Sequence, residues 1–136
     1  MIKMNINRKK FIEKFIKIKS KNGDIINLQL NHGQEKLYNL IKNEAQKNKP
    51  IRIIILKPRQ IGFSTLIEAL NFTNTMFRFN TNTGIITHSD EATNNLYNMT
   101  KLMYEKMPKE LRPETKYSNA KELVFDKEDG TGLKSS

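Results

Sequence analysis

The sequence predicts an α/β fold, and three observations support this prediction. The run Ile51-Arg52-Ile53-Ile54-Ile55-Leu56 is almost continuously β-branched, which is typical of a strand buried on both faces of a sheet. A Gly-containing loop at 57–65 leads from this run into a helical stretch that reaches about Phe79. A short strand at 85–87 and another helix follow. The order strand, loop, helix, strand, helix indicates a right-handed α/β unit with parallel strands.

The N-terminal region predicts a β-hairpin preceded by a helix. Residues 1–10 are basic and show no period, so we expect an arm there. A short helix over 8–15 would place Phe11, Ile12 and Phe15 on one face. Two alternating runs in 15–30 flank Asn22-Gly23, a pair that suits a two-residue hairpin turn. In this hairpin, the facing residues would be Ile16 and Ile18 against Ile26 and Leu28.

Residues 32–48 predict a helix that ends before Pro50. Asn31 is a candidate cap, with Gln34 three residues later. The expected buried stripe is formed by Leu37, Leu40, Ile41 and Ala45.

The C-terminal half predicts a turn at 80–84 and, after the strand at 85–87, a helix over 90–106 that is capped by Ser89 and ended by Pro108. Its inner face would carry Leu96, Met99 and Met103. A short strand is expected over 121–126, and residues 128–136 are polar and contain glycine.

Composition excludes several classes of site. The 136 residues suffice for one hydrophobic core and are short for two. The absence of cysteine excludes disulfides, thiolate metal sites and a cysteine nucleophile, and 2 histidines cannot close a metal site by themselves. No apolar run approaches the roughly 18–20 residues of a membrane span, and no apolar core follows the basic N-terminus. We therefore expect a soluble, intracellular, unsecreted protein.

Charge is unevenly distributed along the chain. The net charge is +10, and residues 1–60 hold 15 basic and 4 acidic residues, whereas 61–136 hold 9 and 10. The N-terminal half therefore favours an acidic partner.

The loop at 57–65 carries the candidate chemistry. A strand followed by a Gly-containing loop and a helix N-terminus forms a phosphate site, because free backbone N–H groups and the helix dipole converge there. The ordinary pattern is Gly-x-x-x-x-Gly-Lys-Ser/Thr. If Gly62 is the second glycine, Ser64 takes the hydroxyl position, Lys57 replaces the first glycine and Phe63 replaces the lysine. From this pattern alone, a tight connection without a ligand is the simpler interpretation.

The complete loop sequence is Lys57-Pro58-Arg59-Gln60-Ile61-Gly62-Phe63-Ser64-Thr65. It resembles the deviant phosphate loop of large terminase subunits. These are the ATP-driven motors that package DNA into tailed-phage capsids. In that family an Arg-Gln pair commonly precedes the glycine, and some members place the lysine at the start of the loop, where Lys57 lies. The resemblance implies a P-loop NTPase-like partial parallel sheet, preceded here by the hairpin and first helix, with ATP and Mg²⁺ as cofactors.

The resemblance gives each loop residue an expected role. Lys57 would supply the cation near the β- and γ-phosphates. The hydroxyl of Ser64 would bind Mg²⁺, with Thr65 as the alternative. Arg59 would be a second phosphate contact or a catalytic charge stabiliser in the transition state. The remaining expected cofactor-binding residues of the loop are Gln60, Gly62 and Phe63.

Two flanking segments agree with the resemblance. Residues 23–41 look like the stretch in which a glutamine of the family reads adenine, and Gln34 matches that position. Because Asn31 and Gln34 also have capping-box spacing, both interpretations stay open. Residues 84–113 look like the family's next strand and helix. His88 would then lie at a ligand-binding strand end, or alternatively be a surface histidine.

Such motors also need a strand that ends in an acidic pair, for Mg²⁺ and for the attacking water. The nearest candidate is the segment 123–128, in which Lys127 lies between the carboxylates of Asp126 and Glu128. We interpret this segment as an ordinary strand and turn. The carboxylate cluster of the family's nuclease domain is also absent. The chain thus resembles the N-terminal part of a terminase ATPase domain (11–136) behind a basic arm (1–10). We expect weak ATP binding and little or no hydrolysis by this chain alone.

The resemblance also implies partners and a location. These are double-stranded phage DNA, the small terminase subunit and the portal of the procapsid, in the cytoplasm of a bacterial host with a phage or prophage. In the sheets of related ATPases, the strand before the phosphate loop and the next strand along the chain are not neighbours, because strands from later in the chain lie between them. We therefore expect exposed apolar surface at Ile53, Ile55, Ile85 and Ile86, and with it low stability or a homo-oligomer.

Two other functions remain open. Residues 1–21 carry 8 basic residues and 1 acidic residue, so a small basic nucleic-acid-binding protein is the first alternative. The second is a helicase-type P-loop ATPase, whose pocket uses a similar glutamine.

Overall fold

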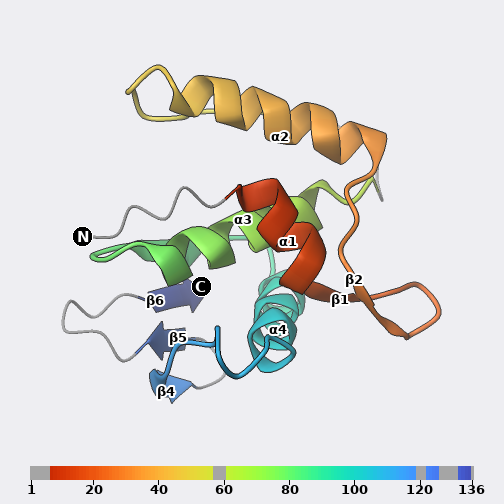
Figure 1. Ribbon diagram of the computed structural model, residues 1–136, viewed down its shortest axis with the longest axis vertical. Helices are drawn as coiled ribbons and strands as arrows, with labels where there is room; N and C mark the ends of the chain where they lie inside the picture. Colours follow the sequence, from red (N-terminus) through yellow and green to blue (C-terminus); the bar gives the residue numbers. More distant parts are fainter. Residues whose placement is uncertain (1–6, 57–60, 119–121, 126–131, 136) are drawn as a thin grey trace.

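The computed structural model describes residues 7–56, 61–118, 122–125 and 132–135. These residues form a mixed α/β structure with four helices and two small sheets (Figure 1). The helices are α1 (Arg8–Phe15), α2 (His32–Ala45), α3 (Phe63–Phe77) and α4 (Asp90–Glu105). Strands β1 (Lys17–Lys19) and β2 (Ile25–Asn27) form one sheet. The other has the order β3-β6-β5-β4, made from β3 (Asn82–Ile85), β4 (Thr115–Ser118), β5 (Glu122–Phe125) and β6 (Gly132–Ser135).

The predicted hairpin is confirmed, but its turn is longer than expected. Ile18 pairs with Ile26 in an antiparallel register. The Ser20 amide donates to the Asp24 carbonyl at 2.8 Å, and the Gly23 amide donates to the Ser20 carbonyl at 3.0 Å. Three residues, 21–23, therefore lie between the last paired positions, instead of the Asn-Gly pair alone. Gly23 closes this loop with φ +93°, a value that favours glycine.

The predicted helices are present, and the two predicted N-terminal caps are confirmed, although α3 begins at Phe63, within the stretch predicted to be a loop. Side chains of Asn31 and Ser89 accept hydrogen bonds from the backbone N–H groups of Gln34 and Ala92. The α4 face differs from the prediction, because its buried residues are Thr93, Tyr97, Thr100 and Met103, whereas Leu96 and Met99 are only partly buried. The α2 stripe is also narrower than predicted. Leu37 is buried, but Leu40 is 46% exposed, Ile41 is partly buried and Ala45 is exposed.

The prediction of a buried strand at 51–56 is wrong. This segment is assigned to neither sheet, and Ile54 and Leu56 are 94% and 96% exposed. A β-branched run becomes a buried strand only when neighbouring strands pair with its backbone and other elements cover its faces. No described strand pairs with this segment. Ile53 and Ile55 are half-buried, and Ile86, which follows β3, is 85% exposed, so part of the expected apolar surface is present. Ile85, by contrast, is buried.

The four-stranded sheet is mixed rather than parallel. Only β3 and β6 pair in parallel among the described strands, and β5 pairs antiparallel with both β6 and β4. β3 begins at Asn82, within the stretch predicted to be a turn, and ends at Ile85, where the strand was predicted to begin. β5 confirms the strand expected near 121–126 over its described residues, but no sequence pattern predicted β4 or β6.

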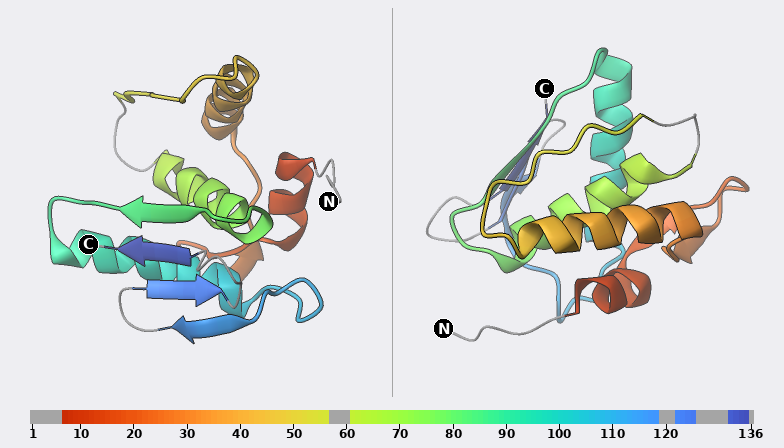
Figure 2. Two further views of the ribbon diagram at one scale, coloured as in Figure 1. Left: turned by 90° about the vertical axis from the view of Figure 1, so that its left-hand side faces the viewer. Right: turned by 90° about the horizontal axis from the view of Figure 1, so that it is seen from above.

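Helix α3 lies at the centre of the fold. It contacts α1, α2 and α4, and it meets the sheet at β3 and β6. Figure 2 shows α3 and α4 on the same face of the four-stranded sheet. The main core joins α1, the hairpin, α3, α4 and β5 through Phe11, Ile12, Ile16, Leu28, Ala69, Phe72, Met76, Tyr97, Met103, Met107, Leu123 and Phe125. Each large apolar side chain contributes about 1.5–3 kcal/mol when fully buried, so this cluster fixes the position of α3.

Candidate functional site

Gly62 sets the geometry of the turn that begins α3. It is the N-cap residue with φ +76° and ψ 15°, a left-handed conformation that other residues adopt at a cost. Its carbonyl accepts the first helical bond, from the Leu66 amide at 3.2 Å. No side chain of the described residues caps this end, although α1, α2 and α4 are all capped by side chains. Within the described part of the chain, the first-turn N–H groups of α3, where the dipole favours negative charge, therefore have no capping side-chain oxygen.

The N-terminus of α2 holds this turn in place. The Gln34 Nε2 donates to the Gly62 carbonyl at 2.7 Å, and the Asn31 Nδ2 donates to the Ile61 carbonyl at 3.3 Å. The capping box that Asn31 and Gln34 predicted is present, with both reciprocal bonds at 2.9 Å. A Cβ on Gly62 would lie 2.7 Å from the Gln34 Nε2. Hydrogen bonds therefore hold the turn before α3 against the N-terminal cap of α2.

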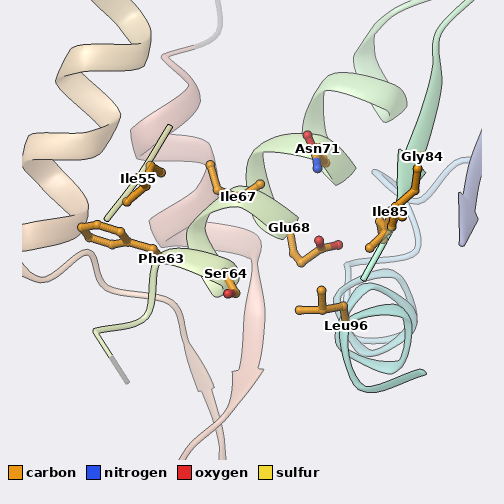
Figure 3. A pocket seen from close by; sticks show the side chains of 10 residues that line it. Ile55, Phe63, Ser64, Ile67, Glu68, Asn71, Gly84, Ile85 and Leu96 are labelled. Carbon is orange, nitrogen blue, oxygen red and sulfur yellow. The ribbon is translucent and has the colours of Figure 1, made fainter. Parts of the chain in front are cut away.

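A cleft of about 300 Å³ opens beside the first turns of α3 (Figure 3). Its walls come from α3, from the 51–56 segment, from the end of β3 and from α4. The apolar lining residues are Ile55, Phe63, Ile67, Ile85, Ile86 and Leu96. This size and lining lie at the lower end of those found for small-molecule sites.

The polar residues of the cleft lie on a single face of α3. They are Ser64, Glu68 and Asn71, spaced by four and three residues, so that their side chains project from the same side of the helix (Figure 3). Ser64 is exposed, whereas Glu68 is 3% exposed. The Glu68 Oε2 accepts a hydrogen bond from the Thr100 Oγ1 of α4 at 2.9 Å. Burial raises the pKa of the Glu68 carboxyl, and the Thr100 bond opposes this effect.

The sequence pattern did not identify Glu68 as a site residue. The available signal was its position, because it is the single acidic residue of α3 and is flanked by Ile67 and Ala69. A charged residue on the apolar face of a helix is rarely buried without a partner.

The structure places the predicted site residues differently. Lys57, Arg59 and Gln60 lie outside the described residues. Gly62, Phe63, Ser64 and Thr65 lie together at the start of α3, and Phe63 and Ser64 line the cleft. Gln34 is next to them, with its amide oxygen and one N–H already bonded; its contact with adenine stays a prediction. His88 is exposed beside the Ser89 cap.

Two basic residues of the N-terminal region, Arg8 and Lys9, interact with side chains of other helices. The Arg8 Nη1 donates to the Asn74 Oδ1 at 2.5 Å, and its guanidinium lies 5.5 Å from the Phe77 ring centroid. Burial and the nearby Arg78 lower the pKa of Arg8. Lys9 pairs with Glu35 at 2.5 Å, and this hydrogen bond raises the pKa of Lys9 and lowers that of Glu35. Within residues 7–21, the exposed basic residues are Lys10, Lys14, Lys19 and Lys21.

Comparison of the sequence with protein-family models found no matching family, and comparison with curated proteins found no match. None of the described helices combines the length and apolar character that spanning a bilayer requires. No three His, Asp or Glu side chains cluster as metal ligands in the described parts of the chain.

Proposed function

We propose that this chain binds ATP as part of a terminase-type packaging ATPase, with the phosphates at the N-terminus of α3. One observation carries the proposal: α3 begins at a left-handed glycine at the edge of a cleft that exposes Ser64, and no side chain of the described residues caps this helix. Such a helix end suits the binding of phosphate oxygens by backbone N–H groups. The resemblance of 57–65 to the terminase loop adds the identity of the ligand.

Lys57 would neutralise the β- and γ-phosphates from the start of the loop, and Arg59 would contact a phosphate or stabilise transition-state charge. Ser64 fits a magnesium-binding role because its hydroxyl is exposed beside the helix end, where the phosphates would lie. Mg²⁺ bound there would screen the phosphate charge. The packaged DNA, the small subunit and the portal are proposed as partners of the same machine.

The test is ATP binding to the full chain, followed with a fluorescent ATP analogue and displaced by unlabelled ATP. Charge-assisted hydrogen bonds contribute about 1.5–3 kcal/mol, so Lys57→Ala should weaken binding by about tenfold or more. The matched control is Lys49→Ala, which removes an exposed lysine of the preceding loop and should leave affinity unchanged. Absence of saturable binding, or equal losses in both variants, would contradict the proposal.

A nucleic-acid-binding function is the second candidate, favoured by the exposed lysines of α1 and the hairpin. It predicts duplex binding whose affinity falls steeply with salt, because phosphate contacts release counterions. Replacing Lys10, Lys14, Lys19 and Lys21 with glutamine should reduce that salt dependence by about 3–4 in the log–log slope. ATP affinity should not change in this variant, which separates the two functions.

A further inference from the structure

The cleft contains a carboxylate that the nucleotide proposal does not use. Glu68 is 3% exposed, and Figure 3 shows its carboxyl group directed toward Ile85 and Leu96 across the cleft. Its Oε2 is bonded to Thr100, which fixes the side chain against α4. The Oε1 has no hydrogen bond from any described residue.

A carboxylate in an apolar cleft requires compensation. Burying an unpaired charge is costly, and buried carboxylates are therefore paired with cations or bound to metals. Among the described residues that line this cleft, none is a lysine, arginine or histidine. A bound cation would favour the ionised form of the carboxyl, which burial otherwise disfavours.

The donor atoms of the same face are all oxygen-bearing groups. Ser64 contributes a hydroxyl, Glu68 a carboxylate and Asn71 a carboxamide, and none is a soft ligand. Hard oxygen donors of this kind select Mg²⁺-class cations. A magnesium ion typically takes one or two protein oxygens and completes its octahedron with water and substrate phosphates. Ser64 and Glu68, one helical turn apart, match that partial set.

We propose that Glu68 is a magnesium-binding residue of the nucleotide site, acting with Ser64 on one face of α3. In this arrangement Ser64 binds the cation directly and Glu68 accepts a hydrogen bond from a metal-bound water. Thr100 positions the carboxylate for that contact. The inference rests on the proposed nucleotide site, because phosphate oxygens must supply the remaining ligands. It places a carboxylate for the metal on the helix that follows the loop.

The experiment uses Mn²⁺ as the probe and the full chain with ATP. Nucleotide affinity is first measured in EDTA and then with Mn²⁺, whose free concentration is followed by electron paramagnetic resonance. Glu68→Gln keeps the shape and can still accept the Thr100 bond, but it removes the negative charge. We expect the variant to lose about tenfold or more in Mn²⁺ affinity of the nucleotide complex, the usual effect of removing an outer-sphere ligand. Metal-free ATP affinity should not fall in this variant.

Glu110→Gln is the matched control, because it removes a carboxylate from an exposed loop. Equal Mn²⁺ affinity in Glu68→Gln and Glu110→Gln would overturn the inference while leaving ATP binding intact. Absence of ATP binding in EDTA and in Mn²⁺ alike would instead contradict the proposed function, and the inference with it.

A measurement on the unsubstituted protein covers the case in which Glu68→Gln does not fold. With ATP bound, Mn²⁺ should broaden the methyl resonances of Ile85 and Leu96, which line the cleft, and leave those of Ile25 in the hairpin unaffected. Uniform broadening, or broadening at Ile25 alone, would overturn the proposed metal position.

Discussion

Replacing Gln34 with glutamate tests the link between α2 and the turn before α3. The side chain of Gln34 makes two bonds, accepting from the Asn31 amide at 2.9 Å and donating to the Gly62 carbonyl at 2.7 Å. Gln34→Glu preserves the first bond, because glutamate is an ordinary partner in a capping box. It replaces the second donor with a carboxylate oxygen that faces a carbonyl oxygen. The perturbation is therefore confined to the contact that holds Gly62.

The expected loss follows from that contact. A neutral hydrogen bond contributes about 0.5–1.5 kcal/mol, and an unsatisfied buried polar group costs a further 1–3 kcal/mol or so. Because Gln34 is 3% exposed, solvent cannot replace the lost donor. We therefore expect Gln34→Glu to lower the free energy of unfolding by about 2–4 kcal/mol near neutral pH.

The assay is urea unfolding followed by circular dichroism, with the unsubstituted protein measured in parallel. Acid provides the internal control. Below the pKa of the introduced carboxyl, its protonated form can donate to the Gly62 carbonyl again, so the difference between variant and parent should shrink. A variant as stable as the parent near neutral pH, or a deficit that is independent of pH, would refute the reasoning.

Four further outcomes are expected. Gly62→Ala should destabilise by about 1–2 kcal/mol in thermal unfolding, because alanine at positive φ is strained and its Cβ would press on Gln34; unchanged stability would contradict the left-handed assignment. Ser89→Ala should cost about 1 kcal/mol by loss of the α4 cap, whereas Ser89→Asn should not. Because burial raises the pKa of Glu68, the folded state binds this proton more tightly than the unfolded state does. The free energy of unfolding should therefore fall as pH rises from the ordinary pKa of glutamate to the pKa of Glu68 in the folded state. Glu68→Gln should abolish this pH dependence in unfolding curves measured over a series of pH values. Ile54→Thr should change stability by less than about 0.5 kcal/mol yet reduce self-association in sedimentation velocity, because this side chain is 94% exposed.

Local signals predicted the helices and the capped starts of α2 and α4. Asn31 and Ser89 precede helical patterns and carry side-chain acceptors at the distance a cap requires, and both make the expected bonds. The hairpin was predictable because Asn22-Gly23 lies between two alternating runs. These features depend on residues a few positions apart, so the sequence contains all the information they need.

The candidate site was predictable only in part. Gly62 and Ser64 were found because a glycine before a helix and a hydroxyl in its first turn form a local pattern. Glu68 was not found, because its burial depends on Thr100, 32 residues away on another helix. The role of Gln34 at the turn was likewise invisible, since it bonds a carbonyl 28 residues distant.

The sequence by itself determined that four helices form, where the capped helices α2 and α4 begin, and that the hairpin turns at Asn22-Gly23. Only the tertiary structure decided which segments form the four-stranded sheet. The run at 51–56 has a strong β pattern yet remains unpaired, whereas the polar segments 115–118 and 132–135 join the sheet. Helical hydrogen bonds close within four residues, but a strand's bonds belong to whichever distant segment lies beside it, and a local pattern does not encode that neighbour.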